Sequence, residues 1–228
     1  MIAVRKAEDR GHANHGWLDT NHTFSFADYY DPQQMGFGPL RVINEDRVAP
    51  GRGFGTHGHR DMEIVSYVVS GALAHKDTIG AGGVIRRGEI QRMSAGTGVQ
   101  HSEMNGSKTE PVHFLQIWIM PRARGGAPAY EQKDFGDQRG LVQLVGPDGR
   151  DGAIAIGQDV DIWRALLDAD SSIELPLRHR SAWIQVVSGE IAIDGKTLGP
   201  GDGAALSDVS ALAFRTKKET EALLFDLA

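Results

Sequence analysis

Short apolar runs separated by glycine-rich turns dominate this sequence and limit the folds that it can adopt. Between residues 40 and 119 the runs are LRVINEDRV, MEIVSYVVSG, GGVIRRGEIQRM and VHFLQIWIM, and similar runs return after residue 140. Apolar runs of this length, bounded by turn residues, predict strands rather than helices. The 29 glycines supply turn positions for many short strands. We therefore expect an all-β protein with few short helices, the best candidates being residues 27–30 and 130–135.

The composition limits the classes of function. The formal net charge of -6 argues against a nucleic-acid partner, because binding to phosphate backbones favours a basic face. The chain has no cysteine, which excludes disulfides, thiolate metal sites and cysteine nucleophiles. The N-terminal residues have no apolar core of signal-peptide length, and no run of about 18 apolar residues occurs anywhere. These features predict a soluble, cytoplasmic protein with no membrane partner.

Two halves are indicated by a linker-like segment and by a weak internal repeat. Residues 121–130, PRARGGAPAY, collect proline, glycine and small residues without apolar periodicity. Moving the second half back by 118 positions lays Val186–Gly189 over Val68–Gly71, and both segments read VVSG. A strand, a glycine turn and another strand thus occur twice. We expect two β-domains, residues 1–130 and residues 131–228.

Two pairs of potential metal ligands stand out in the first half. His57 and His59 are two residues apart with Glu63 four further on, and His101 and Glu103 are again two apart. In an extended strand, residues at even spacing share one face. Two such strands meeting in a barrel would bring the side chains around one ion. Imidazole with carboxylate suits Fe, Mn, Co, Ni, Cu or Zn rather than Ca or Mg.

These residues carry a resemblance to a known family. The pattern Gly51-x5-His57-x-His59-x3-Glu63 resembles the first cupin motif, and the stretch from Gly88 to Asn105 resembles the second. Ser94 stands where the second motif usually has proline, and the spacing from Gly96 to His101 is two residues longer than is typical of cupins. The longer form, SAGTGVQHSE, together with HGHRDMEIVSYVVSGALAHKD and FLQIWIMP, resembles the pirin family and its bacterial quercetinase-like members.

The resemblance implies a bicupin of two double-stranded β-helix (jelly-roll) barrels whose N-terminal barrel binds a divalent transition metal. Carried onto this chain, the implied ligands are His57, His59, His101 and Glu103, with Fe(II) as the expected metal and Zn, Mn, Co, Ni or Cu as alternatives. General cupins use the carboxylate at the position of Glu63, so Glu63 stays open as a replacement for Glu103 or as a residue that supports the ligands.

The second barrel is expected to hold no metal, because the repeat replaces every ligand. With the offset of 118, His57 and His59 fall on Leu175 and Leu177, and Glu63 falls on Ser181. Aligning Gly88 with Gly201 places Phe214 over His101 and Thr216 over Glu103.

The remaining histidines and aromatic residues have plainer explanations. We expect His12, His15, His22 and His179 at the surface, and we favour structural roles for His75 and His113 over roles as pocket residues near the metal. Several aromatic residues could line a cavity for a flat substrate, although apolar core is the favoured role for each: Phe24, Phe26, Tyr29, Tyr30 and Trp118.

Resemblance to pirin-like quercetinases predicts a metal-dependent dioxygenase acting on quercetin-like flavonols. In that reaction the 3-hydroxyl of the flavonol coordinates the metal, dioxygen attacks, the ring opens and carbon monoxide leaves, with Glu103 as both ligand and catalytic base. One alternative is a metal-loaded, redox-responsive protein-interaction module without turnover, and a purely structural metal barrel is another. The resemblance also favours a monomer.

Overall fold

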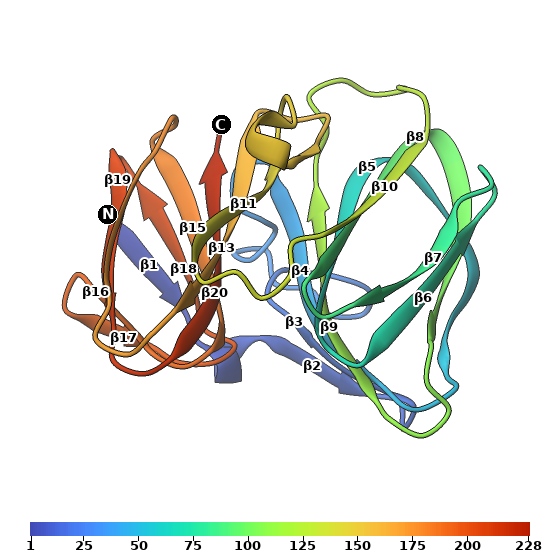
Figure 1. Cartoon of the computed structure of the whole chain (residues 1–228), viewed down its shortest axis with the longest axis horizontal. Coiled ribbons are helices and arrows are strands. Elements are labelled where there is room, and N and C mark those ends of the chain that lie inside the picture. Colours follow the sequence, from blue (N-terminus) through green and yellow to red (C-terminus); the bar gives the residue numbers. More distant parts are fainter. The chain divides into compact units, whose positions relative to one another are not determined.

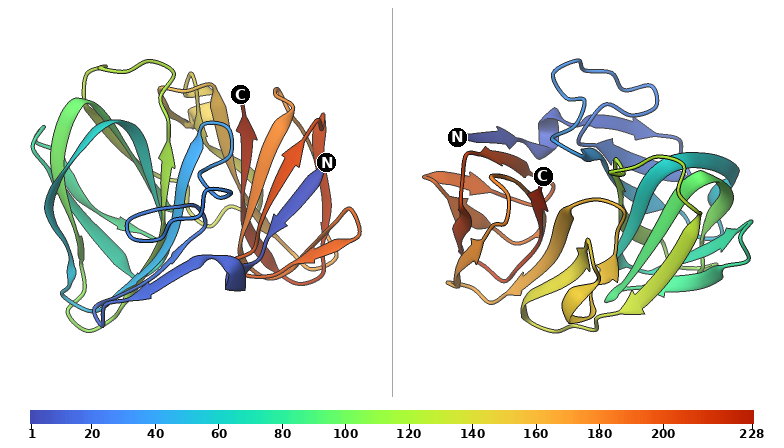
Figure 2. Two further views of the ribbon diagram at one scale, coloured as in Figure 1. Left: turned by 180° about the vertical axis from the view of Figure 1, so that it is seen from behind. Right: turned by 90° about the horizontal axis from the view of Figure 1, so that it is seen from above.

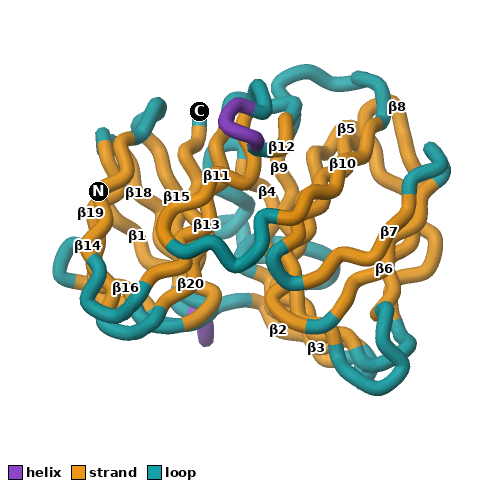
Figure 3. The backbone as a smooth tube through the Cα atoms, viewed as in Figure 1, coloured by secondary structure: helices purple, strands orange, loops and turns teal.

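The computed structural model describes all 228 residues, and nearly all of its regular structure is β-strand (Figure 3). The only helical segments are two three-residue 3-10 helices, Ala7–Asp9 and Arg150–Gly152. The prediction of an all-β bicupin with few short helices is confirmed. Neither helix approaches the length or the apolar content that crossing a membrane would demand.

The two helices expected as the best candidates do not form. Residues 129–134 are strand β10 (Ala129–Asp134), which pairs antiparallel with β8 (Glu89–Asn105). Ala27 and Asp28 form a turn, closed by a bridge between Phe26 and Tyr29. The pairing of β10 depends on a partner some forty residues away, so its local sequence carried no reliable sign of it.

The chain forms two compact units, of which one contains residues 11–136 and 156–158. Its strands form one nine-stranded sheet in the order β2-β3-β4-β9-β5-β8-β6-β7, with β10 beside β8. Figure 1 shows β5, β8 and β10 curving together, and the view from above shows the strands of each unit curving round (Figure 2). The other strands are β2 (Gly11–Asn14), β3 (Leu18–His22), β4 (Leu40–Val48), β5 (Gly53–Ser70), β6 (Ala72–Asp77), β7 (Gly82–Arg86) and β9 (Val112–Ile119).

The other unit contains residues 1–10, 137–155 and 159–228. It has a seven-stranded sheet in the order β1-β18-β15-β20-β13-β11-β12 and a four-stranded sheet in the order β14-β19-β16-β17. Its strands are β1 (Ile2–Arg5), β11 (Gly140–Gly146), β12 (Ile154–Ala155), β13 (Val160–Leu167), β14 (Ser172–Pro176), β15 (Ser181–Ser188), β16 (Ile191–Ile193), β17 (Lys196–Leu198), β18 (Gly203–Ser207), β19 (Ala211–Thr216) and β20 (Thr220–Leu227).

The two units differ in their limits from the expected division into residues 1–130 and residues 131–228. Residues 1–10 group with the C-terminal unit because β1 pairs antiparallel with β18. Residues 131–136 stay with the N-terminal unit because β10 pairs with β8. Residues 156–158 also join it, where the amide of Arg122 donates to the carbonyl of Gly157. Strand pairing over long sequence separations sets these limits, and the composition of residues 121–130 does not reveal it.

The internal repeat is real in three dimensions. Strand β5 ends at Ser70 and β6 begins at Ala72, while β15 ends at Ser188 and β16 begins at Ile191. The turn glycines between them, Gly71 and Gly189, have φ angles of 80° and 84°. This left-handed region favours glycine, which explains why both copies keep it.

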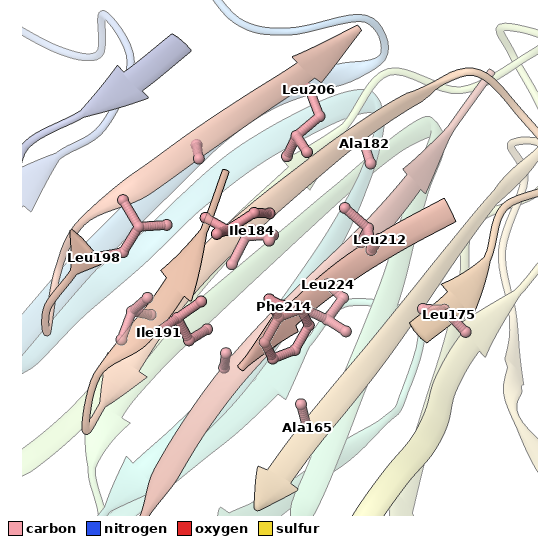
Figure 4. Close-up of a cluster of buried hydrophobic side chains, with 14 of the residues drawn as sticks. Ala165, Leu175, Ala182, Ile184, Ile191, Leu198, Leu206, Leu212, Phe214 and Leu224 are labelled. Carbon is pink, nitrogen blue, oxygen red and sulfur yellow. The ribbon is translucent and has the colours of Figure 1, made fainter. Parts of the chain in front are cut away.

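At the repeat-equivalent positions of the metal-ligand candidates, the C-terminal unit carries apolar side chains, apart from Ser181 and Thr216. Leu175 and Phe214 are buried in one large cluster of branched aliphatic residues (Figure 4), and Leu177 packs against it. Thr216 is buried and its hydroxyl donates to the carbonyl of Asp168 over 2.7 Å. Where the N-terminal unit gathers histidines, this unit has a hydrocarbon core.

Candidate metal centre

Three imidazoles converge on one point inside the N-terminal unit. His57 and His59 lie on β5, and His101 lies on the adjacent β8, where His57 and His101 are register partners. The Nε2 atom of His101 is 2.9 Å from Nε2 of His59 and 3.1 Å from Nε2 of His57. The Nδ1–H of His57 donates to the carbonyl of Gly55 over 2.8 Å, which leaves its Nε2 lone pair facing the other two rings.

The spacing of these nitrogens fits a bound metal ion. Two ligand nitrogens at 2.0–2.1 Å from one ion and at right angles to each other lie about 2.9 Å apart. The distances of 2.9 and 3.1 Å between the Nε2 atoms match this value. Three lone pairs facing one another at such distances repel unless a cation lies between them, so the donor set suits a first-row transition metal.

The electrostatics favour neutral imidazoles. Burial, followed by the neighbouring charge of His57, lowers the pKa of His59 to about 4. Burial, followed by the charges of His57, His59 and His75, lowers the pKa of His101 to about 3. At neutral pH both rings are therefore uncharged, and their lone pairs are available to a cation.

Glu103 lies beside His101 at the edge of this cluster. Its ligand atoms fall within 4.8 Å of those of His101 and His75, but it does not belong to the group formed by the three converging histidines. Gln116 Nε2 donates to Glu103 Oε2 over 2.8 Å, and Ser66 Oγ donates to Oε1 over 3.2 Å. Burial is the main cause that raises the pKa of Glu103 to about 7. The carboxyl group is thus buried, oriented by two donors and close to ionising at neutral pH.

Glu63 does not share the face of the histidines, contrary to the expectation from even spacing. The β5–β8 register shifts between His59 and Asp61, and Asp61 has a φ of 66°. Such a bulge reverses the alternation of side chains beyond it. Glu63 therefore accepts a hydrogen bond from Ser94 Oγ over 2.8 Å, and its pKa is raised mainly by burial. Ser94, which stands where cupins usually have proline, is thus the partner of Glu63.

A cavity of about 200 Å³ opens beside the histidines, and His57, His59 and Glu103 line it. Its apolar wall includes Leu18, Phe26, Ala27, Phe54, Phe114 and Trp118, and its polar wall includes His15, Thr20, His22, Asn44, Asp46 and Gln116. Trp118 stands edge-on to both Phe26 and His59, with ring centroids 5.3 and 5.0 Å apart. The cavity thus joins an apolar wall with aromatic rings to a polar end at the histidine cluster.

The sequence missed several cavity residues. His22, expected at the surface, is buried, lines the cavity and contacts Asn44 Oδ1 through Nδ1 over 2.8 Å. Asp46 is buried as well, and desolvation is the main cause that raises its pKa to about 7. The alternation of LDTNH, which places Leu18, Thr20 and His22 on one face of β3, was the available signal.

The other side chains singled out in the sequence lie in different environments. His12 is exposed beside Asp19, and His15 is exposed at the cavity. His113 is half-buried and contacts Glu45, whereas His75 is buried against His101. Among the aromatic candidates, Phe26 and Trp118 line the cavity, Phe24 is buried and Tyr30 is 73% exposed.

Comparisons with known proteins agree over the whole length. Residues 3–119 match the family model Pirin, and residues 143–227 match a model described as quercetinase C-terminal cupin domain. A quercetin 2,3-dioxygenase of Escherichia coli K12 is 50% identical over 228 residues, covering 100% of this chain and 99% of the relative. A putative quercetin 2,3-dioxygenase of Pasteurella multocida is 44% identical, with 100% of both chains covered.

Solved structures agree with these matches. The crystal structure of the bacterial pirin YhhW from E. coli in complex with nickel(II) has a TM-score of 0.96 and 49% identity, covering 100% of this chain and 99% of that one. The E. coli protein YhaK has a TM-score of 0.78 and 27% identity, covering 95% of this chain and 97% of that one.

Proposed function

The chain belongs to the pirin family, and from this premise we propose that it is a metal-dependent dioxygenase that cleaves quercetin-like flavonols with dioxygen. The names of full-length relatives at 50% and 44% identity support this activity over the alternative of an interaction module without turnover. The observation that carries the proposal is the convergence of three Nε2 atoms on the wall of a cavity that also presents a buried carboxyl group.

We assign the metal ligands to His57, His59, His101 and Glu103. The distances between the three Nε2 atoms support the histidines, and the nickel(II) complex of a relative supports a divalent metal. Glu103 is favoured over Glu63 because it neighbours His101 and lines the cavity, whereas Glu63 is bound to Ser94. We propose Fe(II) as the native metal. When bound, it supplies a Lewis acid for the hydroxyl oxygen of the substrate and a centre at which dioxygen reacts.

The chain's own residues would bind the flavonol and move one proton. The edge-on rings of Phe26 and Trp118 offer an apolar surface for a flat ring system, and Asp46 and Asn44 offer hydrogen-bonding groups for its hydroxyls. A carboxylate oxygen of Glu103 accepts the proton of the 3-hydroxyl. Ser66 and Gln116 donate to this carboxyl group and hold it in place for the transfer.

Oxygen uptake on quercetin tests the activity. The metal-loaded protein should consume dioxygen and release carbon monoxide with quercetin, and elemental analysis of the untreated protein should find a stoichiometric transition metal. His101→Ala should abolish turnover while the protein stays folded. His113→Ala is the matched control, because His113 lies outside the cavity and contacts Glu45 instead. Full turnover by folded His101→Ala, or no turnover by metal-loaded wild type, would refute the proposal.

The remaining expectations stay predictions. We propose an N-terminal domain near residues 1–130 and a C-terminal domain near residues 131–228. The replaced ligand positions support a C-terminal cupin domain without a metal. We also propose a monomer that works in the cytoplasm, with a small aromatic substrate and dioxygen as its partners.

A further inference from the structure

Behind His101 lies a buried line of polar side chains that the proposed reaction does not use. The Nδ1 atom of His75 is 3.3 Å from Nδ1 of His101, and Nε2 of His75 is 3.0 Å from Asp77 Oδ2. The side chains of His75 and Asp77 are both 0% exposed. The line runs from an imidazole of the candidate metal centre to an enclosed carboxylate.

Strand pairing and packing hold this line in place. In the β6–β8 register, His75 lies opposite Glu103 and Asp77 opposite His101. Tyr130 stacks on the ring of His75, with centroids 4.7 Å apart and planes inclined by 23°. Asp77 Oδ1 accepts hydrogen bonds from the amides of Ile79 and Ala81 over 3.0 and 2.9 Å. The second carboxylate oxygen of Asp77 is therefore fixed toward His75.

One arrangement of hydrogens satisfies every contact in the line. A neutral imidazole carries one N–H, whereas a carboxylate only accepts. If Asp77 accepts from Nε2–H of His75, then Nδ1 of His75 has a lone pair, which accepts the Nδ1–H of His101. The hydrogen of His101 is then on Nδ1, and its Nε2 lone pair faces His57 and His59.

We propose that Asp77 and His75 are positioning residues that hold His101 in the tautomer that binds the metal. The inference rests on the proposed metal site. We call the pair of Asp77 and His75 the relay. His57 needs no relay, because its Nδ1–H donates directly to a carbonyl, which can only accept. The ring of His75 can either donate or accept at Nδ1. The tautomer of His101 is therefore set by Asp77, which fixes the tautomer of His75. Outer partners of this kind fix ligand tautomers at metal sites.

Asp77→Asn tests the relay from a residue that does not touch His101. The amide oxygen of the new side chain can still accept from Ile79 and Ala81, which turns its NH₂ group toward His75. His75 then accepts at Nε2 and donates from Nδ1, and His101 must carry its hydrogen on Nε2. We expect Zn(II) to bind about 10–100-fold more weakly by calorimetry. Nitrogen-15 NMR of the metal-free protein should show the hydrogen of His101 moved from Nδ1 to Nε2.

Two comparisons separate tautomer control from packing. Glu45→Gln changes a second histidine–carboxylate contact of this barrel, the partly buried one between His113 and Glu45, and should leave Zn(II) affinity unchanged. His75→Asn keeps an acceptor at the position of Nδ1 and should bind Zn(II) within about threefold of wild type, whereas His75→Leu should lose as much as Asp77→Asn. These two variants also serve if Asp77→Asn does not fold.

The outcomes distinguish the relay from the metal site itself. Wild type without Zn(II)-induced shifts at the rings of His57, His59 and His101 would refute the proposed metal site. If wild type binds Zn(II) there, the relay is overturned by unchanged affinity and an unchanged His101 tautomer in Asp77→Asn. Equal losses in His75→Asn and His75→Leu would also overturn it, because packing alone would then explain them.

Discussion

Gln116→Leu should weaken metal binding by removing the shorter hydrogen bond to Glu103. Gln116 Nε2 donates to Glu103 Oε2 over 2.8 Å, and leucine is apolar and of similar size. At pH 6 the metal-free protein holds Glu103 protonated, since its pKa is raised to about 7, and a metal would require the ionised form. A bond to an ionised group contributes roughly 1.5–3 kcal/mol and a neutral bond about 1 kcal/mol. The difference of roughly 0.5–2 kcal/mol corresponds to about 2–30-fold weaker Zn(II) binding.

Calorimetric titration of the metal-free protein with Zn(II) at pH 6 measures this loss, and urea unfolding measures the accompanying loss of stability, expected at about 1 kcal/mol. Gln185→Leu is the matched control, because Gln185 is also a buried amide, lies in the C-terminal unit and donates to the carbonyl of Gly201. Wild-type Zn(II) affinity in folded Gln116→Leu, or the same loss in Gln185→Leu, would refute the assignment of Gln116 as the group that orients Glu103.

Three further substitutions test other parts of the structure. Glu63→Gln should leave Zn(II) affinity within about threefold of wild type while Glu103→Gln loses at least tenfold, since only Glu103 neighbours His101; the reverse order would move the ligand to Glu63. Asp46→Asn should flatten the pH dependence of stability in the metal-free protein. The folded pKa of Asp46 is raised from 3.8 to about 7, so its ionisation costs wild type stability as pH rises from about 4 to about 7; equal slopes in urea unfolding would contradict this. Gly189→Ala should destabilise the protein by about 1–3 kcal/mol or more, because φ is 84° and a Cβ atom would meet the carbonyl of Glu219. Gly195→Ala, with φ of 69° and open space, should cost about 1 kcal/mol, and equal costs at both sites would remove the steric argument.

Within the site, even spacing predicted which side chains share a face only where the strand is regular. The prediction failed where the strand pairing is interrupted by a bulge. The even spacing of His57 and His59 correctly predicted a shared face, because β5 is extended there. The same rule misplaced Glu63, because the bulge between His59 and Asp61 reverses the alternation. A bulge depends on the pairing of two strands, and the local sequence of residues 57–63 does not specify it.

The sequence by itself determined the strand class, the internal repeat and the candidate metal-binding side chains, because alternation, glycine turns and histidine pairs are local properties of the chain. Only the tertiary structure decided which carboxyl group neighbours His101, that His22 and Asp46 reach the cavity, and that Asp77 lies behind His75. These relations join strands that are distant in the sequence. Register, bulges and burial set them, and each is fixed by the packing of the whole barrel rather than by any one segment.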